Sequence, residues 1–308
     1  MGIFNATLNQ TLVLFVFLII GFIMKKGKLL PDNTSSVLSR LENIILVPAV
    51  VINTFMNKFT VGNIAAKWTY MIYAAVIATI IIPFAVFASR LMAENDHEKQ
   101  IYKYSFTFAN FSFMGIALVS GAFGEDVLFN YLIYILPLYM VCYSLGVAWL
   151  IPGEGGKVSI HSFLNPICIS LIIGAALGLI RQWFVLPVFM QTALSTGGAC
   201  MGPIAMILTG FVIGGYEIKG LLQGWRVYAM SIIRLILIPS FFILVLKALN
   251  TPSEIVLVAL VSLAMPLGLN TIVIPAAYDG DTKLGASFAL VSSVLGIVTI
   301  PAMLAVFG

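Results

Sequence analysis

The stretch Ala-Met-Pro-Leu-Gly-Leu-Asn-Thr, residues 264–271, lies inside a long apolar run and decides the fold. Pro266 removes a backbone donor and clashes with the preceding helical turn, and Gly268 adds backbone freedom. A second interruption, Phe-Thr-Phe-Ala-Asn-Phe-Ser-Phe-Met-Gly at residues 106–115, contains Asn110 and Ser112, which compete for backbone hydrogen bonds. Non-helical backbone at membrane depth is tolerated only where it is buried in protein or faces a cavity. The two stretches therefore predict two broken helices around a buried site.

The composition around these stretches requires lipid as the solvent. Of the 308 residues, 61% are hydrophobic and 9% are charged, and the mean hydropathy is +1.07. A soluble domain carries roughly 25% charged residues. The net charge of +4 comes from Lys and Arg scattered at helix ends, which excludes the basic stripe of a nucleic-acid-binding protein. The chain is therefore predicted to be an integral membrane protein.

Ten segments have the length of about 20 apolar residues that spans a membrane. We place them at residues 8–24, 37–56, 68–89, 102–122, 127–150, 161–180, 190–213, 226–247, 254–278 and 284–307. Basic residues cluster after the odd-numbered spans, at Lys25, Lys26, Lys28, Arg40, Arg90, Lys99, Lys103, Lys157, Lys219, Arg226 and Lys283. The other side carries only Lys58, Lys67, Arg181 and Lys247. The positive-inside rule then predicts a multi-pass protein of the cell (plasma or inner) membrane with both termini outside.

The two halves of the chain echo each other at one offset. Four dipeptides of the first half recur 156 residues later with the same or a similar residue pair: Leu8-Asn9 as Leu164-Asn165, Leu30-Pro31 as Leu186-Pro187, Ile82-Pro83 as Ile238-Pro239, and Gly124-Glu125 as Gly280-Asp281. Each half holds five spans, an odd number, so the second half must start from the opposite side of the membrane. We predict inverted repeats over residues 1–152 and 153–308, an arrangement typical of secondary transporters. A duplication kept only for packing is the alternative.

The offset pairs Asn110 with Pro266, so the two breaks are expected to meet near the pseudo-two-fold axis. Helix N-termini there would offer unpaired N–H groups and partial positive charge, which suits a carboxylate. A simple Pro/Gly kink is the alternative interpretation. The predicted substrate-binding residues are Asn110, Phe111, Ser112, Met265, Pro266, Gly268, Asn270 and Arg234.

Arg234 lies within a predicted span, where a charge costs about 2.5–3.5 kcal/mol on insertion scales and requires compensation. It could bind a substrate carboxylate, tie down carbonyls freed by a break, or extend its side chain to the membrane surface. No Asp or Glu lies near the middle of a span. Glu42, a turn or two into the second span and beside Asn43, comes nearest. A deep proton relay is therefore not visible in the sequence.

The remaining candidate groups carry no catalytic or metal chemistry. Cys142, Cys168 and Cys200 are far apart in apolar runs, which supports neither a disulfide framework nor a metal site, and we expect them to be small buried side chains. No clustered nucleophile, base or metal set indicates an enzyme, and no cofactor is implied. The glycine-containing runs at residues 174–178 and 198–202 predict close helix packing.

Four segments resemble the auxin efflux carrier family, which includes plant auxin-efflux carriers and bacterial malonate- and malate-type permeases. Its fourth-helix motif, an Asn shortly before Met-Gly-Ile, is matched by Asn110 and residues 114–116. Its ninth-helix pattern is matched by Ala264, Pro266, Gly268, Val273 and Tyr278, its eighth helix by Arg234 and Pro239, and its second helix by Leu46-Val-Pro48-Ala. The resemblance covers nearly the whole chain, without the long central loop of many plant members.

The resemblance implies an all-α fold of ten transmembrane helices, similar to the bile acid/sodium symporter and NhaA-like folds. A scaffold of helices 1, 2, 6 and 7 would hold a moving core of helices 3–5 and 8–10, in which broken helices 4 and 9 cross. It implies elevator-type transport of small organic anions, with Asn110 at the substrate carboxylate, and in many members a homodimer, here through the scaffold helices. Ala109 replaces the Pro of plant members, so a softer break in the fourth helix is expected.

Two other functions compete with an organic-anion carrier. A sodium-coupled symporter of the bile-acid type resembles this topology, but it would need Glu or Gln ligands near the crossing, and the sequence has none there. An anion channel is the other alternative, and single-channel conductance would separate it from a carrier.

Overall fold

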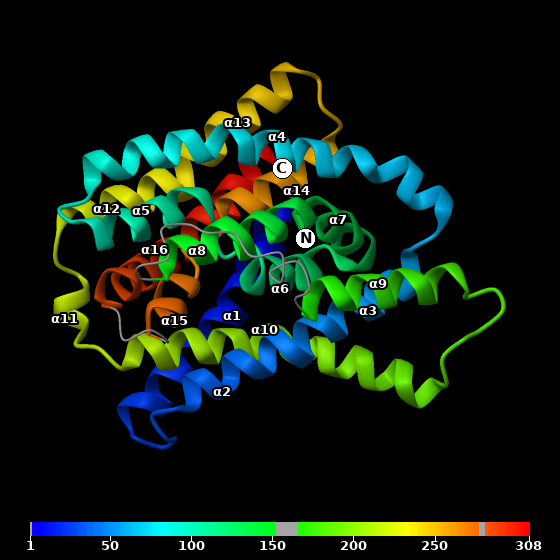
Figure 1. Ribbon diagram of the computed structural model, residues 1–308, viewed down its shortest axis with the longest axis horizontal. Coiled ribbons are helices and arrows are strands. Elements are labelled where there is room, and N and C mark those ends of the chain that lie inside the picture. Colours follow the sequence, from blue (N-terminus) through cyan, green and yellow to red (C-terminus); the bar gives the residue numbers. More distant parts are fainter. Residues whose placement is uncertain (1, 152–165, 277–280) are drawn as a thin grey trace.

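The computed structural model describes residues 2–151, 166–276 and 281–308, and in these ranges the regular structure is entirely helical (Figure 1). The first half contains α1 (Ile3–Lys26), α2 (Thr34–Leu41), η1 (Glu42–Leu46), α3 (Val47–Lys58), α4 (Val61–Met92), α5 (Asp96–Thr107), α6 (Phe113–Ala122), α7 (Gly124–Val141), η2 (Cys142–Gly146) and α8 (Val147–Leu150). The second half contains α9 (Pro166–Leu179), α10 (Val188–Gly214), α11 (Ile218–Leu221), α12 (Trp225–Ile232), η4 (Ile233–Leu237), α13 (Ile238–Ala248), α14 (Ser253–Ala264), α15 (Asn270–Ala276) and α16 (Lys283–Phe307). The η elements are π-helical segments that continue the neighbouring α-helices.

Seven continuous helices in the described ranges are long and apolar enough to cross a membrane, which makes the chain a multi-pass membrane protein. They are Ile3–Lys26, Thr34–Lys58, Ala65–Met92, Gly124–Leu150, Val188–Gly214, Trp225–Ala248 and Lys283–Phe307. They overlap seven of the ten predicted spans. The other three predictions fall on shorter apolar helices, because α5 and α6 are separate helices, α14 and α15 are separate helices, and only part of 161–180 is described.

The count of ten spans and the inverted repeat over 1–152 and 153–308 stay predictions. Several residues used in them lie outside the described ranges, namely Lys157, Leu164, Asn165, Tyr278 and Gly280.

Two helix pairs form one side of the molecule. α1 packs along α10, and α3 packs along α9. Glycines allow the first pair to touch backbone to backbone, since a Cβ on Gly21 would lie 2.7 Å from the Ile207 carbonyl carbon and one on Gly210 would lie 2.8 Å from the Phe22 nitrogen. Gly174 and Gly178 do the same between α9 and α3, as the small-residue run predicted. These close contacts leave little room for the pairs to slide.

The remaining helices form a second group around the broken segments. α4 packs on α5 and α7, α14 packs on α7 and α16, and α12 packs on α16. Large buried side chains fill this group, among them Tyr102, Tyr131, Phe106 and Phe288. Contacts between aromatic rings join the first half of the chain to the second. The ring centroids of Tyr102 and Phe288, for example, are 5.2 Å apart. The site described below lies inside this group and along its border with α2 and α10.

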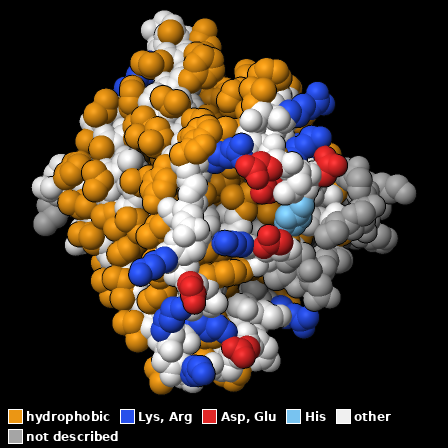
Figure 2. Space-filling model, turned by 90° about the vertical axis from the view of Figure 1, so that its left-hand side faces the viewer, with side chains coloured by type: hydrophobic (Ala, Val, Ile, Leu, Met, Phe, Trp, Pro, Cys, Tyr) orange, Lys and Arg blue, Asp and Glu red, His pale blue; other side chains and the backbone are white. Residues whose placement is uncertain are grey.

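Charged side chains gather on part of the face shown in Figure 2, while hydrophobic side chains cover much of the rest. Ion pairs join several charged side chains of the chain, including Arg226 with Glu94 and Lys25 with Asp32. An apolar surface of this kind suits contact with lipid. It also explains why one expectation about the cysteines is wrong: Cys142 is buried, but Cys200 is exposed on α10, because an apolar side chain facing lipid needs no protein cover.

Candidate functional site

The predicted breaks are present, and they meet. α5 ends at Thr107 and α6 begins at Phe113, while α14 ends at Ala264 and α15 begins at Asn270. The two connecting segments run antiparallel and form one bridge between Ala109 and Leu267. Its hydrogen bond runs from the backbone N–H of Asn110 to the carbonyl of Pro266, at 2.7 Å. A main-chain bond between two interrupted helices therefore defines the crossing.

The break in the first half forms without a proline. Ala109 takes part in the bridge itself, and the five residues from 108 to 112 lie outside any helix. The break is thus present at Ala109 without a proline, and its expected softness stays a prediction. The hydrogen bond to Pro266 gives the backbone at this point a partner that a continuous helix would otherwise provide.

Several hydrogen-bond donors at the start of α6 have no acceptor among the described residues. The Asn110 side-chain oxygen accepts from the Met114 N–H at 3.4 Å, and its main-chain carbonyl accepts from Gly115 at 3.0 Å. Within the described residues, the N–H groups of Ser112 and Phe113 and the side-chain nitrogen of Asn110 donate to no protein acceptor. Asn110 is 6% exposed. A helix N-terminus with free donors carries partial positive charge and attracts anions.

Asn270 holds the other side of the crossing. Its side-chain nitrogen donates to the Tyr104 hydroxyl at 2.7 Å and approaches the Cys142 sulfur at 3.9 Å. Tyr104 and Cys142 are themselves 3.1 Å apart. This cluster joins α15 to α5 and to η2, so Asn270 is tied into the same group of helices as Asn110.

A cavity of about 10 Å³ lies at the crossing, which is about the space of one water molecule. Five of the eight predicted site residues line it: Asn110, Phe111, Ser112, Gly268 and Asn270. Tyr104, Cys142 and Tyr143 complete the polar lining. The cavity is too small for a carboxylic acid, so the structure has the crossing in a closed state.

Two tyrosines of α7 fasten the loop after α5. The Tyr131 hydroxyl donates to the Phe111 carbonyl at 2.7 Å, and the Tyr139 hydroxyl donates to the Ser112 hydroxyl oxygen at 2.8 Å. A Cβ on Gly115 would collide with the Tyr131 hydroxyl, so only glycine fits there. No sequence pattern points to these tyrosines, since aromatic residues in an apolar helix are most often plain core.

Arg234, Met265 and Pro266 do not line the crossing cavity. Arg234 is buried in η4 and donates through Nη1 to the Leu263 carbonyl at 2.9 Å, in the last turn of α14. It therefore satisfies a carbonyl freed by the break, which was one of the three roles considered, and at 1% exposure it does not extend to the surface. A cation at a helix C-terminus also opposes the partial negative charge there.

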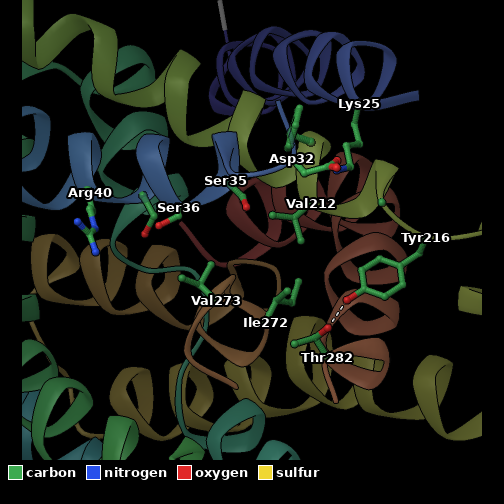
Figure 3. Close-up of a pocket in the computed structure, with 13 residues that line it drawn as sticks. Lys25, Asp32, Ser35, Ser36, Arg40, Val212, Tyr216, Ile272, Val273 and Thr282 are labelled. Atoms are coloured by element: carbon green, nitrogen blue, oxygen red, sulfur yellow. Dashed lines mark hydrogen bonds and ion pairs between the residues drawn. The ribbon is translucent and has the colours of Figure 1, made fainter. Parts of the chain in front are cut away.

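A larger cavity, which we call the vestibule, opens beside the crossing (Figure 3). Its volume is about 730 Å³, within the range of small-molecule sites. In Figure 3, Ser35, Ser36 and Arg40 of α2 lie across the cavity from Ile272 and Val273 of α15. Ser39 of α2 also lines the cavity, and the remaining lining comes from the end of α1, from Asp32, from α10 and from residues 215, 216 and 282. α15 thus borders both cavities, since Asn270 lines the smaller one.

The vestibule carries net positive charge. Lys25 pairs with Asp32 at 2.5 Å, and this ammonium group, with Lys28 further off, holds the pKa of the Asp32 carboxyl below its ordinary value. Arg40 forms no ion pair among the described residues, so none of their carboxylates neutralises its positive charge. At the rim, Tyr216 contacts Thr282 through their hydroxyl groups. A basic cavity with serine hydroxyls attracts anions.

Comparison with protein families identifies a match. A family model described as "Membrane transport protein" matches the chain in two segments, residues 6–161 and 154–304, which together cover nearly all of it. A search of curated proteins found no match.

Proposed function

Because the chain belongs to the membrane transport protein family, that of the auxin efflux carriers, we propose that it is a secondary transporter of small organic anions that works by an elevator-type movement. The family itself makes the chain a membrane transporter. The substrate class and the movement are our inference from the two cavities.

The start of α6 carries the proposal. Ser112 and Phe113 offer N–H groups without acceptors, and the Asn110 amide nitrogen lies beside them with no bond of its own among the described residues. These donors match the oxygens of a carboxylate, which accepts several hydrogen bonds. The crossing would bind the acid, with Asn110 as the principal side-chain contact and Asn270 on the opposite side.

The vestibule supports an anionic substrate. Arg40 and the serines of α2 would raise the local concentration of anions. Because α15 borders both cavities, anions in the vestibule would lie next to the crossing. The closed cavity of about 10 Å³ also favours a carrier over a channel, since substrate has to wait for a movement that opens the crossing.

The helix pairs suggest which part moves. α1 with α10 and α3 with α9 pack through glycines, as a rigid scaffold requires, whereas α4 to α8 and α12 to α16 surround the crossing. We propose that the second group moves against the first with the substrate bound. Exposed apolar side chains on the scaffold helices, such as Ile172 and Phe189, are where a homodimer would form.

Uptake into proteoliposomes tests the function. The purified protein would be given labelled mono- and dicarboxylates, including malonate, malate and indole-acetate, with and without sodium or proton gradients. We expect saturable uptake of at least one acid, lost in Asn110→Ala. Strict dependence on sodium would favour the bile-acid type of symporter, and unitary conductance in a planar bilayer would favour a channel. Absence of uptake for every acid would overturn the organic-anion assignment.

A further inference from the structure

The buried carboxyl group of Glu42 has no role in the site described so far. Glu42 begins η1, inside the second membrane-spanning helix, and its side chain is 0% exposed. Neither carboxyl oxygen has a hydrogen-bond partner among the described residues. Segments of π-helix occur often at functional sites. An ionised carboxylate without partners in apolar surroundings is very costly, whereas a protonated carboxyl is neutral.

Among the residues that the structure describes, no charged group faces Glu42 from the elements that pack on η1. These are α2, α3, α9 and α10, with α7 close by. The titratable side chains that the first four of these elements carry are Arg40, which is exposed on α2, Lys58, which pairs with Asp126 at the far end of α3, Cys168 on α9, and Cys200, which is exposed on α10. Tyr139 lies on α7, and Tyr143 of η2 bonds to the neighbouring Asn43. Of these, Tyr139 interacts electrostatically with Glu42 and with Cys168. A proton is therefore the counter-charge that the described surroundings leave for Glu42.

Glu42 sits between the vestibule and the crossing. Ser39, one helical turn earlier, lines the vestibule, and the Asn43 side chain caps back onto its carbonyl at 2.8 Å. On the other side, Tyr143 donates to the Asn43 side-chain oxygen at 3.1 Å.

Tyr139 extends this link to the substrate side of the crossing. Its ring stacks on that of Tyr143, with centroids 5.9 Å apart, and its hydroxyl reaches Ser112. One contact between scaffold and core thus has Glu42 and Asn43 on one side and the two stacked tyrosines on the other.

We propose that Glu42 is a proton-binding site of the transport cycle, and that the core closes against the scaffold, as seen here, only while Glu42 holds a proton. This inference rests on the proposed transport function. Deprotonation places a charge against the Tyr139 face of α7, and water from the vestibule side must then solvate it, so the closed contact opens. Transport that passes through the closed state therefore slows as the pH rises.

Infrared difference spectroscopy tests the proton site without any substrate. The reconstituted wild-type protein is titrated upward in pH, and the carbonyl stretching band of a protonated carboxyl group is followed. We expect the band to be lost on titration, and to be missing at every pH in Glu42→Gln and in Glu42→Met. Glu217→Gln, which removes an exposed carboxyl, is the matched control and keeps the band. The same spectrum for wild type and both Glu42 variants would overturn the proton site.

Exchange of labelled acid between equal internal and external pools tests the coupling. With equal pH on both sides, wild-type exchange is expected to fall by about tenfold per pH unit above its midpoint, since the protonated fraction falls by that factor. Glu42→Gln exchanges at a rate that changes less than about twofold over the same range. A Glu42→Gln profile that follows the wild type would overturn the proposal. If no acid exchanges in any protein, the transport proposal fails, and the infrared result alone decides whether Glu42 binds a proton.

Discussion

The backbone N–H of Asn110 donates to the carbonyl of Pro266, and through this bond the two interrupted helices meet. The side chain of Asn110 takes no part in this bond. It accepts one long bond from Met114, so it contributes little to holding the crossing. The structure thus separates the joint, made by main chain, from recognition, which we assign to the side chain.

Replacing Asn110 tests that separation. Asn110→Ala keeps the main-chain bond to Pro266 and loses the long hydrogen bond from the Met114 N–H, which costs about 1 kcal/mol of stability. We expect at least tenfold weaker binding of the transported acid, measured by calorimetry on folded protein. Asn63→Ala, which changes an exposed asparagine of α4, should leave affinity unchanged. Unchanged affinity in Asn110→Ala would remove the crossing from the binding site.

Arg234 is expected to matter for stability more than for affinity. Arg234→Ala leaves the Leu263 carbonyl without its donor, a loss of about 1–3 kcal/mol for a buried bond to a charged group. Thermal unfolding in detergent measures the loss, and binding of the acid by the folded fraction should change by less than about threefold. A variant of wild-type stability that had lost only binding would make Arg234 a substrate ligand instead.

The Tyr139–Ser112 hydrogen bond predicts non-additive substitutions. Tyr139→Phe and Ser112→Ala each remove the same bond, so the double variant should be about 1 kcal/mol more stable than the sum of the single losses indicates. Chemical unfolding of the four proteins gives this coupling. Tyr139→Phe combined with Ser231→Ala, on α12, is the distant control and should be additive. Additivity in the first cycle would show that the two hydroxyls are not coupled.

Charges of the vestibule are expected to govern the rate of substrate capture. Arg40→Gln should lower uptake at subsaturating acid by about two- to fivefold at low salt, with no change at saturation. Asp32→Asn should have the opposite effect, because it frees the charge of Lys25. Both effects should fade near 1 M salt, where the Debye length is about 3 Å. Arg181→Gln, which affects a bond to Asn57 away from the vestibule, is the control.

The pH dependence of uptake is a further test of the ion pair between Lys25 and Asp32. Since Lys25 holds the pKa of Asp32 below its ordinary value, Asp32 stays ionised at neutral and mildly acidic pH. The contribution of its ion pair to stability is fully present above the pKa that Asp32 has in the unfolded chain. It is lost only as the pH falls through the lowered pKa of Asp32 in the folded protein. The difference between wild type and Asp32→Asn should therefore persist down to about pH 5. Its disappearance above that pH would contradict the ion pair.

Close packing of α1 on α10 predicts a strong effect of a single methyl group. Gly210→Ala would place a Cβ 2.7 Å from the Leu18 carbonyl carbon, so the helices must separate, at a cost of about 2 kcal/mol or more. Gly62→Ala is the matched control, since a Cβ there meets nothing within 4 Å. Thermal unfolding of the two variants compares them. Equal stability would mean that the two helices are free to move apart.

The sequence predicted the breaks because proline, glycine and asparagine act on the local backbone. Pro266 ends α14 wherever that helix packs, and the apolar runs mark seven long helices by composition alone. The cost of a charge in lipid left three roles open for Arg234, and in the structure its side chain donates to the Leu263 carbonyl.

Contacts between distant segments could not be read in this way. The link from Asn270 to Tyr104 joins residues 166 positions apart, and it depends on how α5 and α15 pack. The burial of Glu42 likewise depends on which face of the second span turns inward. A π-helical segment shifts that face by a fraction of a turn, and no residue type in the sequence announces it.

A joint made of main chain tolerates change in the side chains around it. The bridge of Ala109 with Leu267 uses groups that every residue except proline can supply on the donor side, so substitutions at 111, 112 or 270 need not disturb how the segments meet. Relatives that share this backbone pairing can therefore bind different substrates and keep the same crossing of the two segments. Mutational libraries aimed at new acids should therefore vary these three positions and leave the backbone pairing untouched.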